Sequence, residues 1–116
     1  MIERVELEEL KTVLSGVTVG VGSQIMVFEN GATLLVQCPF KCERQGNELF
    51  GHGENIFTST LLMKFLSKKV KQATFQDGVI TLNFESAGRI IILPDANGLE
   101  SYVLTTRHGI SQVSRI

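Results

Sequence analysis

Apolar and polar residues follow a helical spacing and then a strand-like alternation, and this sequence of two patterns occurs twice along the chain. Residues 5–14 carry apolar side chains at helical spacing, and residues 17–38 then alternate between apolar and small or polar side chains. Helical spacing returns over residues 57–66, and a clearer alternation follows over residues 70–93. Each half is therefore predicted to form one short amphipathic helix followed by strands that bury one face.

Two dipeptides divide the predicted strands at matching places. Asn30-Gly31 and Asp77-Gly78 tolerate the positive φ angles that tight hairpins need, and residues 86–88 supply a further turn. Each half is then predicted to be a helix followed by a three-stranded meander. The chain is predicted to be internally duplicated, with pseudo-repeats over about residues 5–55 and 56–116.

Two segments lie outside this shared plan. Glycine and charged residues interrupt any period over residues 39–55, which predicts either a long hairpin or an irregular excursion. The chain ends in a predicted hairpin with strands over residues 99–107 and 110–115, split at His108-Gly109. If residues 40–50 are the counterpart of this last hairpin, the repeat is nearly complete.

These elements predict an α+β fold that is mostly antiparallel β. Its meander sheets are expected to form a sandwich or a partly open barrel, accompanied by two short helices. Thr58 or Ser59 is expected to cap the second helix, and residues 94–98 are expected to form a turn. A chain of 116 residues fits a single domain, 1–116, which buries roughly two thirds of the surface its unfolded form exposes.

Charge and hydropathy narrow the classes of partner. Eleven basic and twelve acidic residues give a formal charge of −1, so the field of the whole molecule is too weak to recruit nucleic acid or an anionic membrane. The first residues lack the basic segment and apolar core of a secretory signal. The longest apolar runs, residues 25–28 and 90–93, are far shorter than the ~20 residues that span a bilayer. A cytoplasmic protein is expected.

Candidate metal and catalytic chemistry is sparse. Cys38 and Cys42 have a spacing that zinc tolerates, but even with His52 a fourth ligand is missing, so buried or edge thiols are predicted and neither a metal nor another cofactor. His52 and Glu54 place a base near a carboxylate on a glycine-rich segment, but nothing completes a mechanism. No catalytic residue is predicted, and the chain is expected not to be an enzyme.

The segment from Lys41 to Glu54 mixes charged and aromatic side chains in a way that suits a protein interface. A purely structural hairpin accounts for the same composition. A basic cluster further along, Lys64, Lys68, Lys69 and Lys71, is interpreted as the solvated end of the second helix. The predicted partner-binding residues are Glu43, Arg44, Glu48, Phe50, His52 and Glu54.

The second half of the chain also carries an ordered set of motifs. They are Leu66, Asp77-Gly78, Leu82-Asn83-Phe84-Glu85, Gly88, Pro94-Asp95 and Glu100-Ser101-Tyr102. In this order they resemble a family of small bacterial β-rich domains of uncharacterised activity. The resemblance covers the second half of the chain and extends loosely to the first meander.

The resemblance implies a binding module, because members of such families are often immunity proteins encoded beside bacterial toxins, including those of contact-dependent growth inhibition. The expected partner is then a cognate toxin domain, for example a nuclease, whose active site the chain would occlude. Three other hypotheses stay open. One is a β-barrel-like domain that binds a small molecule or lipid, and another is a homodimer formed through an exposed strand edge. The third is an enzyme, which would need His52 or a carboxylate to titrate abnormally and to matter for turnover.

Overall fold

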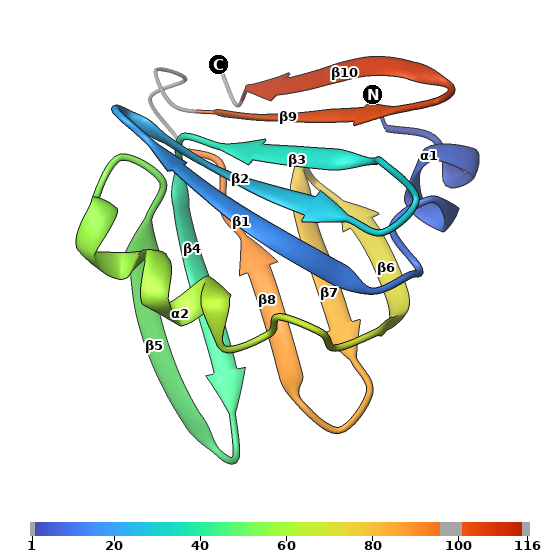
Figure 1. The fold of residues 1–116 in the computed structure, drawn as a ribbon. Coiled ribbons are helices and arrows are strands. Elements are labelled where there is room, and N and C mark those ends of the chain that lie inside the picture. The colour runs from blue at the N-terminus through green and yellow to red at the C-terminus, as the bar shows by residue number, and fades with distance from the viewer. Residues whose placement is uncertain (1, 96–100, 115–116) are drawn as a thin grey trace.

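Two antiparallel five-stranded sheets dominate the structure, a computed structural model that describes residues 2–95 and 101–114 (Figure 1). The first sheet has the order β1-β2-β3-β9-β10, and the second has the order β5-β4-β8-β7-β6. The strands of the first are β1 (Leu14–Gly20), β2 (Ser23–Phe28), β3 (Thr33–Val36), β9 (Ser101–Thr106) and β10 (Gly109–Ser114). The strands of the second are β4 (Pro39–Arg44), β5 (Asn47–His52), β6 (Val70–Gln76), β7 (Val79–Phe84) and β8 (Gly88–Ile92).

Each sheet combines a meander from one half of the chain with a hairpin from the other half. The first meander, β1-β2-β3, continues through β3 into the C-terminal hairpin β9-β10, where Leu34 lies opposite Leu104. The second meander, β6-β7-β8, continues through β8 into the hairpin β4-β5, where Cys42 lies opposite Ile90. The two halves are therefore interleaved, with neither sheet built from one half alone.

The inward faces of both sheets share one apolar core. Alternate residues of β2 and β7 are buried, because successive side chains of a strand point to opposite faces. The large, fully buried side chains include Met26, Phe28, Leu34, Phe40, Ile80, Leu82, Ile90 and Tyr102. Burial of one such side chain stabilises the fold by about 1.5–3 kcal/mol. This core holds together the two sheets, whose strands cross one another in Figure 1.

The starts of β1 and β6 join the two sheets at one corner. The Leu14 N–H donates to the Lys68 carbonyl at 3.0 Å, and the Val70 N–H donates to the Thr12 carbonyl at 3.0 Å. Between these bonds, Val13 and Lys69 form an antiparallel bridge. Both strands have a register shift just after this point, at Leu14/Gly16 in β1 and at Val70/Gln72 in β6. The same local geometry therefore occurs at the same place in each meander.

The first helix is shorter than predicted. The structure has α1 at Arg4–Glu8, and Leu14 already belongs to β1, so the predicted helix over residues 5–14 is wrong in its second half. Leu10 and Leu14 fit the helical spacing because the core buries both of them, although both lie beyond the end of α1. The backbone N–H of Leu14 donates to the Lys68 carbonyl, so it cannot make the hydrogen bond that a continuing helix would require.

The second helical segment consists of a 3₁₀ turn, η1 (Ile56–Thr58), and α2 (Ser59–Met63), so the predicted helix over 57–66 ends too late. Thr58 is the N-cap residue of α2, as predicted, but its side chain makes no capping hydrogen bond, whereas Asn55 caps the 3₁₀ turn by accepting from the Phe57 N–H at 3.0 Å. α2 contacts β1, and α1 lies beside β6 in Figure 1, so each helix contacts the first strand of the other half. Neither α1 nor α2 has the length and apolar character to cross a bilayer.

The segment 39–55 is a hairpin, which settles one open alternative. Its turn, Gln45-Gly46, has φ of 52° and 83°, the pair of positive angles typical of a type I′ turn. Asp77-Gly78 has the same geometry, with φ of 51° and 82°, as predicted. The C-terminal hairpin is confirmed over residues 101–114, whereas most of the predicted turn at 94–98, together with Leu99, Glu100 and Arg115, lies outside the described residues.

Candidate partner-binding surface

The predicted partner-binding residues lie on both faces of the β4-β5 hairpin and just beyond it. Glu43 pairs with Glu48 and Pro39 pairs with His52, so by strand alternation Glu43, Glu48, Phe50 and His52 share the outer face of the second sheet. Arg44 belongs to the opposite, inner face. Glu54 follows the hairpin and is exposed. The structure thus brings four of the six residues together on one face.

An ion-pair network fixes the charged side chains of this outer face. Lys41 Nζ lies 3.1 Å from a Glu43 carboxylate oxygen and 3.6 Å from one of Glu48. Arg89 of β8, directly opposite Glu43, donates its Nε to the Glu43 carboxylate. Arg89 first and Lys41 second hold the pKa of Glu43 below its usual range, and Glu43 raises the pKa of Lys41. Two carboxylates can face each other here because cations flank them.

Arg44 has a different environment. Its guanidinium carbon lies 5.9 Å from the centroid of the Phe65 ring, within the range of a cation–π interaction. Its Nε is buried and has no hydrogen-bond acceptor among the described residues. Arg44 is therefore held against the core edge on the inner face, apart from Glu43 and Glu48.

The glycines around His52 serve close packing. A Cβ on Gly51 would lie 2.4 Å from the Phe40 ring, and a Cβ on Gly53 would lie 2.0 Å from the Val36 carbonyl oxygen. His52 Nδ1 accepts from the Glu54 N–H at 3.1 Å, and the His52 N–H donates to Thr58 Oγ1 at 3.1 Å. The glycine-rich segment around His52 is thus packed tightly and hydrogen-bonded.

The edge of β5 offers backbone groups to a partner. The Gly53 N–H donates to the Cys38 carbonyl at 2.9 Å, and this bond fixes the alternation of the β4-β5 ladder. By that alternation the backbone groups of Glu48, Phe50 and His52 point away from β4. Thr58 and Gln24 occupy those of His52, but no described residue bonds to those of Glu48 and Phe50.

Exposed apolar side chains gather beside this edge. Nine large apolar side chains are exposed in the described part of the chain, and five of them lie between residues 49 and 63. Phe57 on η1 is 84% exposed and Phe50 on β5 is 67% exposed. The other three are Leu49, Ile56 and Met63. A concentration of this kind beside polar groups is typical of protein-binding surfaces.

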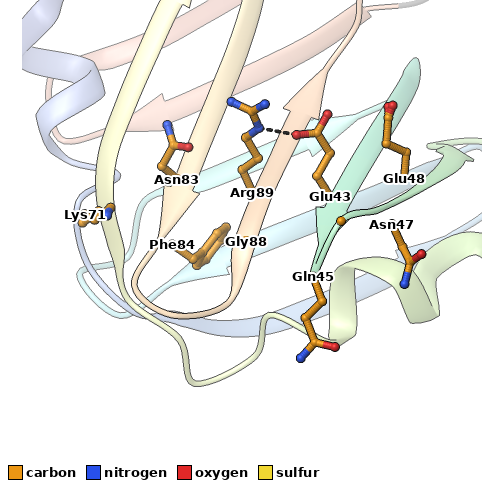
Figure 2. A pocket seen from close by; sticks show the side chains of 10 residues that line it. Glu43, Gln45, Asn47, Glu48, Lys71, Asn83, Phe84, Gly88 and Arg89 are labelled. Carbon is orange, nitrogen blue, oxygen red and sulfur yellow. Dashed lines mark hydrogen bonds and ion pairs between the residues drawn. The ribbon is translucent and has the colours of Figure 1, made fainter.

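An open pocket of ≈ 480 Å³ extends from the hairpin tip across the outer face of the second sheet. Figure 2 shows Asn83, Arg89, Glu43 and Glu48 in a row over neighbouring strands, with Lys71 at the far end. The row carries cations at one end and carboxylates at the other, and it widens the polar surface that begins at the hairpin.

No family model, curated protein or solved structure matches this chain.

Within the described residues, no group of three or more His, Cys, Asp and Glu side chains is placed to hold a metal ion. Cys38 and Cys42 are buried thiols, as predicted. Burial raises the pKa of Cys42 to about 12, although Arg44 and Lys64 oppose that rise. A thiol with such a pKa stays protonated at neutral pH, which makes Cys42 a poor nucleophile.

Sequence reasoning missed Arg89, Asn83 and the exposed Ile56 and Phe57 of η1 as parts of this surface. Arg89 reaches Glu43 only because β8 pairs with β4, and strand order is not encoded in local pattern. Phe57 carried a usable signal, because a large apolar residue that precedes the cap of a short helix has little core to bury in. The helical spacing over residues 57–66 places Phe57 on the apolar face of the predicted helix, but in the structure its side chain is exposed.

Proposed function

We propose that this chain is a cytoplasmic immunity protein that binds and occludes a cognate bacterial toxin. The observation that carries the proposal is the gathering of exposed Phe50, Phe57 and Ile56 beside the fixed charges of the β4-β5 hairpin. Buried aromatic anchors surrounded by polar groups are the usual composition of a tight protein interface. Catalysis and a cofactor form no part of this proposal.

The arrangement of charge supports a partner with a basic active site. Glu43, Glu48 and Glu54 all lie on or beside the hairpin, and Lys41 and Arg89 keep the first of these ionised and in place. Because Lys41 and Arg89 offset the charge of Glu43 and Glu48, we expect these carboxylates to set the register of a basic partner rather than to speed its association. A nuclease, whose substrate is a polyanion, would present such a surface, so we assign the toxin to that class.

Strand addition is the binding mode we propose for the edge of β5. The outward N–H and C=O groups of Glu48 and Phe50 are available to a strand of the toxin, while Thr58 and Gln24 limit the open edge at His52. A partner strand held there would place its side chains over Phe50 on one face and Leu49 on the other.

We further propose that the fold is an internal duplication, arranged as a sandwich closed at one corner. Equivalent bonds at the starts of β1 and β6, equivalent register shifts and the reciprocal exchange of hairpins support a common ancestor for the halves. Two copies that exchanged hairpins would first have been a domain-swapped dimer.

A small-molecule or lipid-binding barrel is the alternative. It would need a cavity lined by the apolar strand faces, but those faces bury Met26, Leu34 and Ile80 completely against one another. The open pocket of Figure 2 lies on the outer face, and most of the residues that line it are polar or charged. A homodimer through β5 is a further alternative, and it would compete with the toxin for the same edge.

The test combines co-purification of the tagged chain with the product of the adjacent upstream gene and a growth assay of that gene with and without this chain. Binding and restored growth are expected. Phe50→Asp should abolish both, whereas Ile110→Asp, a matched change at a 74% exposed position on β10, should leave both intact. Absence of binding and rescue would overturn the proposal. Equal damage from the two variants would show that the interface lies elsewhere.

A further inference from the structure

A second, smaller pocket lies on the opposite side of the hairpin, between its tip and α2. Its volume is ≈ 200 Å³, below the range of about 300–1,000 Å³ that holds drug-sized ligands, so it suits a ligand of a few heavy atoms. Its walls combine two cations with two amides and two aliphatic side chains: Arg44, Lys64, Gln45, Asn47, Leu49 and Leu61.

The charge of this pocket is uncompensated. Arg44 and Lys64 both line it, and no carboxylate does. Neither cation forms an ion pair with any residue in the described ranges, in contrast to Lys41 of the same hairpin and Arg89 of the neighbouring strand β8 on the outer face. Cys42, the remaining lining residue, stays a neutral thiol because burial raises its pKa to about 12. The positive charge therefore has no internal counter-ion.

Arg44 also has an unused donor. Its Nε is buried without an acceptor among the described residues, although buried polar atoms are almost always hydrogen-bonded. The Phe65 ring centroid lies 5.9 Å from the guanidinium carbon and holds the group in place, so the guanidinium is preorganised for an incoming anion. The two unpaired cations of the pocket, Arg44 and Lys64, are what favours an anion there.

We propose that this pocket binds a small carboxylate. Arg44 suits a carboxylate because the planar guanidinium presents parallel N–H donors that match its two oxygens, and Lys64 adds a second charge. Leu49 and Leu61 provide contact for a short aliphatic chain attached to the carboxylate. The carboxylate belongs either to a free small organic acid or to an aspartate or glutamate of a partner protein. The proposal is independent of the toxin assignment, because it depends only on the pocket.

The test is a titration of the ¹⁵N-labelled chain with isobutyrate, followed through its backbone amide resonances. Saturable shifts are expected at residues 44–47 and 61–64. Lys64→Met and Arg44→Lys should each weaken binding about tenfold, since each removes a charge-assisted contact. Lys68→Met removes the same charge from an exposed neighbouring position outside the pocket and should leave binding unchanged.

The absence of saturable shifts at these amides would overturn the proposal, and so would equal weakening by Lys64→Met and Lys68→Met. Because Arg44 packs on Phe65, thermal unfolding of each variant checks that it folds, and the exposed Lys64 keeps the test decisive if Arg44→Lys is unstable. Inorganic phosphate serves as the competing anion, and stronger binding of phosphate than of isobutyrate would also overturn the carboxylate assignment.

The same experiment distinguishes the two sources of the carboxylate. N-acetyl-glutamate N-methylamide presents a glutamate side chain without a free main-chain carboxylate. Binding of this compound at least as tight as that of isobutyrate supports a carboxylate from a partner protein. Binding of isobutyrate alone supports a free organic acid. These outcomes are separate from toxin binding, which Phe50→Asp tests on the other face of the hairpin.

Discussion

Arg89 on β8 lies directly opposite Glu43 on β4, and its Nε donates a hydrogen bond to the Glu43 carboxylate. The two residues come from different halves of the chain. They lie where β8 of the second meander pairs with β4, which belongs to the hairpin of the first half. Lys41 completes the arrangement from the same face of β4. The β4–β8 contact between the halves and the proposed toxin-binding face thus share one ion-pair network. The stability of that contact is therefore coupled to the geometry of the surface.

Replacement of Glu43 should make stability depend less on pH. The folded-state pKa of Glu43 lies below the ordinary value of 4.5, so its contribution is fully present above that value and is lost as the pH falls through the folded pKa. Glu43→Gln should therefore be less stable than the parent chain at pH 7 but not in strong acid. Urea unfolding at a series of pH values checks this.

Glu85→Gln is the matched control for that experiment, because Glu85 is exposed and its side chain makes no hydrogen bond or ion pair with the described residues. It should leave the pH profile unchanged. A stability difference for Glu43→Gln that persists undiminished into acid would contradict the expected role of the ionised carboxylate.

Gly53→Ala should strongly destabilise the fold because the added methyl group would clash with the backbone of β3. A Cβ at Gly53 would lie 2.0 Å from the Val36 carbonyl oxygen, so β3 and the end of the hairpin must separate. We expect a loss of about 3 kcal/mol, the upper part of the range for overpacking. Gly22→Ala is the control, because its φ of +81° strains a side chain but no atom lies within 4 Å. Denaturant unfolding should rank the two variants in this order.

Proline substitution on β5 distinguishes its two edges. The backbone N–H of Leu49 faces β4, so Leu49→Pro leaves a buried carbonyl unpaired and should cost about 1–3 kcal/mol. The N–H of Phe50 faces outward, so Phe50→Pro should largely preserve the fold but prevent a partner strand from pairing. Circular dichroism melts and toxin pull-down measure the two effects. A Phe50→Pro variant that folds and still binds would exclude strand addition at this edge.

Local pattern predicted most strands because alternation and turn chemistry act over a few residues. Asp77-Gly78 adopts the positive φ angles that its composition favours, and β7 buries every second side chain as its alternation requires. The exchange of hairpins was not predictable in this way, because the pairing of Glu43 with Arg89 depends on contacts distant in sequence. A strand carries no local mark of which neighbour it will have.

The helix lengths and the second pocket also depend on contacts that local sequence pattern does not reveal. Leu10 and Leu14 have helical spacing, but the bridge between residues 13 and 69 ends any helix before Leu14. Arg44 was grouped with Glu43 because both are charged neighbours, yet adjacent residues of a strand point to opposite faces. Lys64 was assigned to solvent within a basic cluster, and only the packing of α2 beside the hairpin places it near Arg44.

Tyr102 offers a spectroscopic test of the core, because it is the one tyrosine in the chain. The phenol is fully buried and donates to the Gly78 carbonyl at 2.7 Å, which joins β9 of one sheet to the β6-β7 turn of the other. Burial raises the pKa of Tyr102 above its ordinary value of 10.0, so its contribution to stability is present below that pH and is lost as the pH rises toward the folded pKa. Phenolate absorbance should therefore stay low past pH 10 and appear together with alkaline unfolding followed by circular dichroism.

Tyr102→Phe should lower the free energy of unfolding at neutral pH by about 1 kcal/mol, the net contribution of one hydrogen bond. Between neutral and alkaline pH the variant should lose less of its free energy of unfolding than the parent chain loses. Ionisation of Tyr102 near its ordinary pKa in a chain that remains folded would show that the phenol reaches solvent and that the two sheets are not joined at this point.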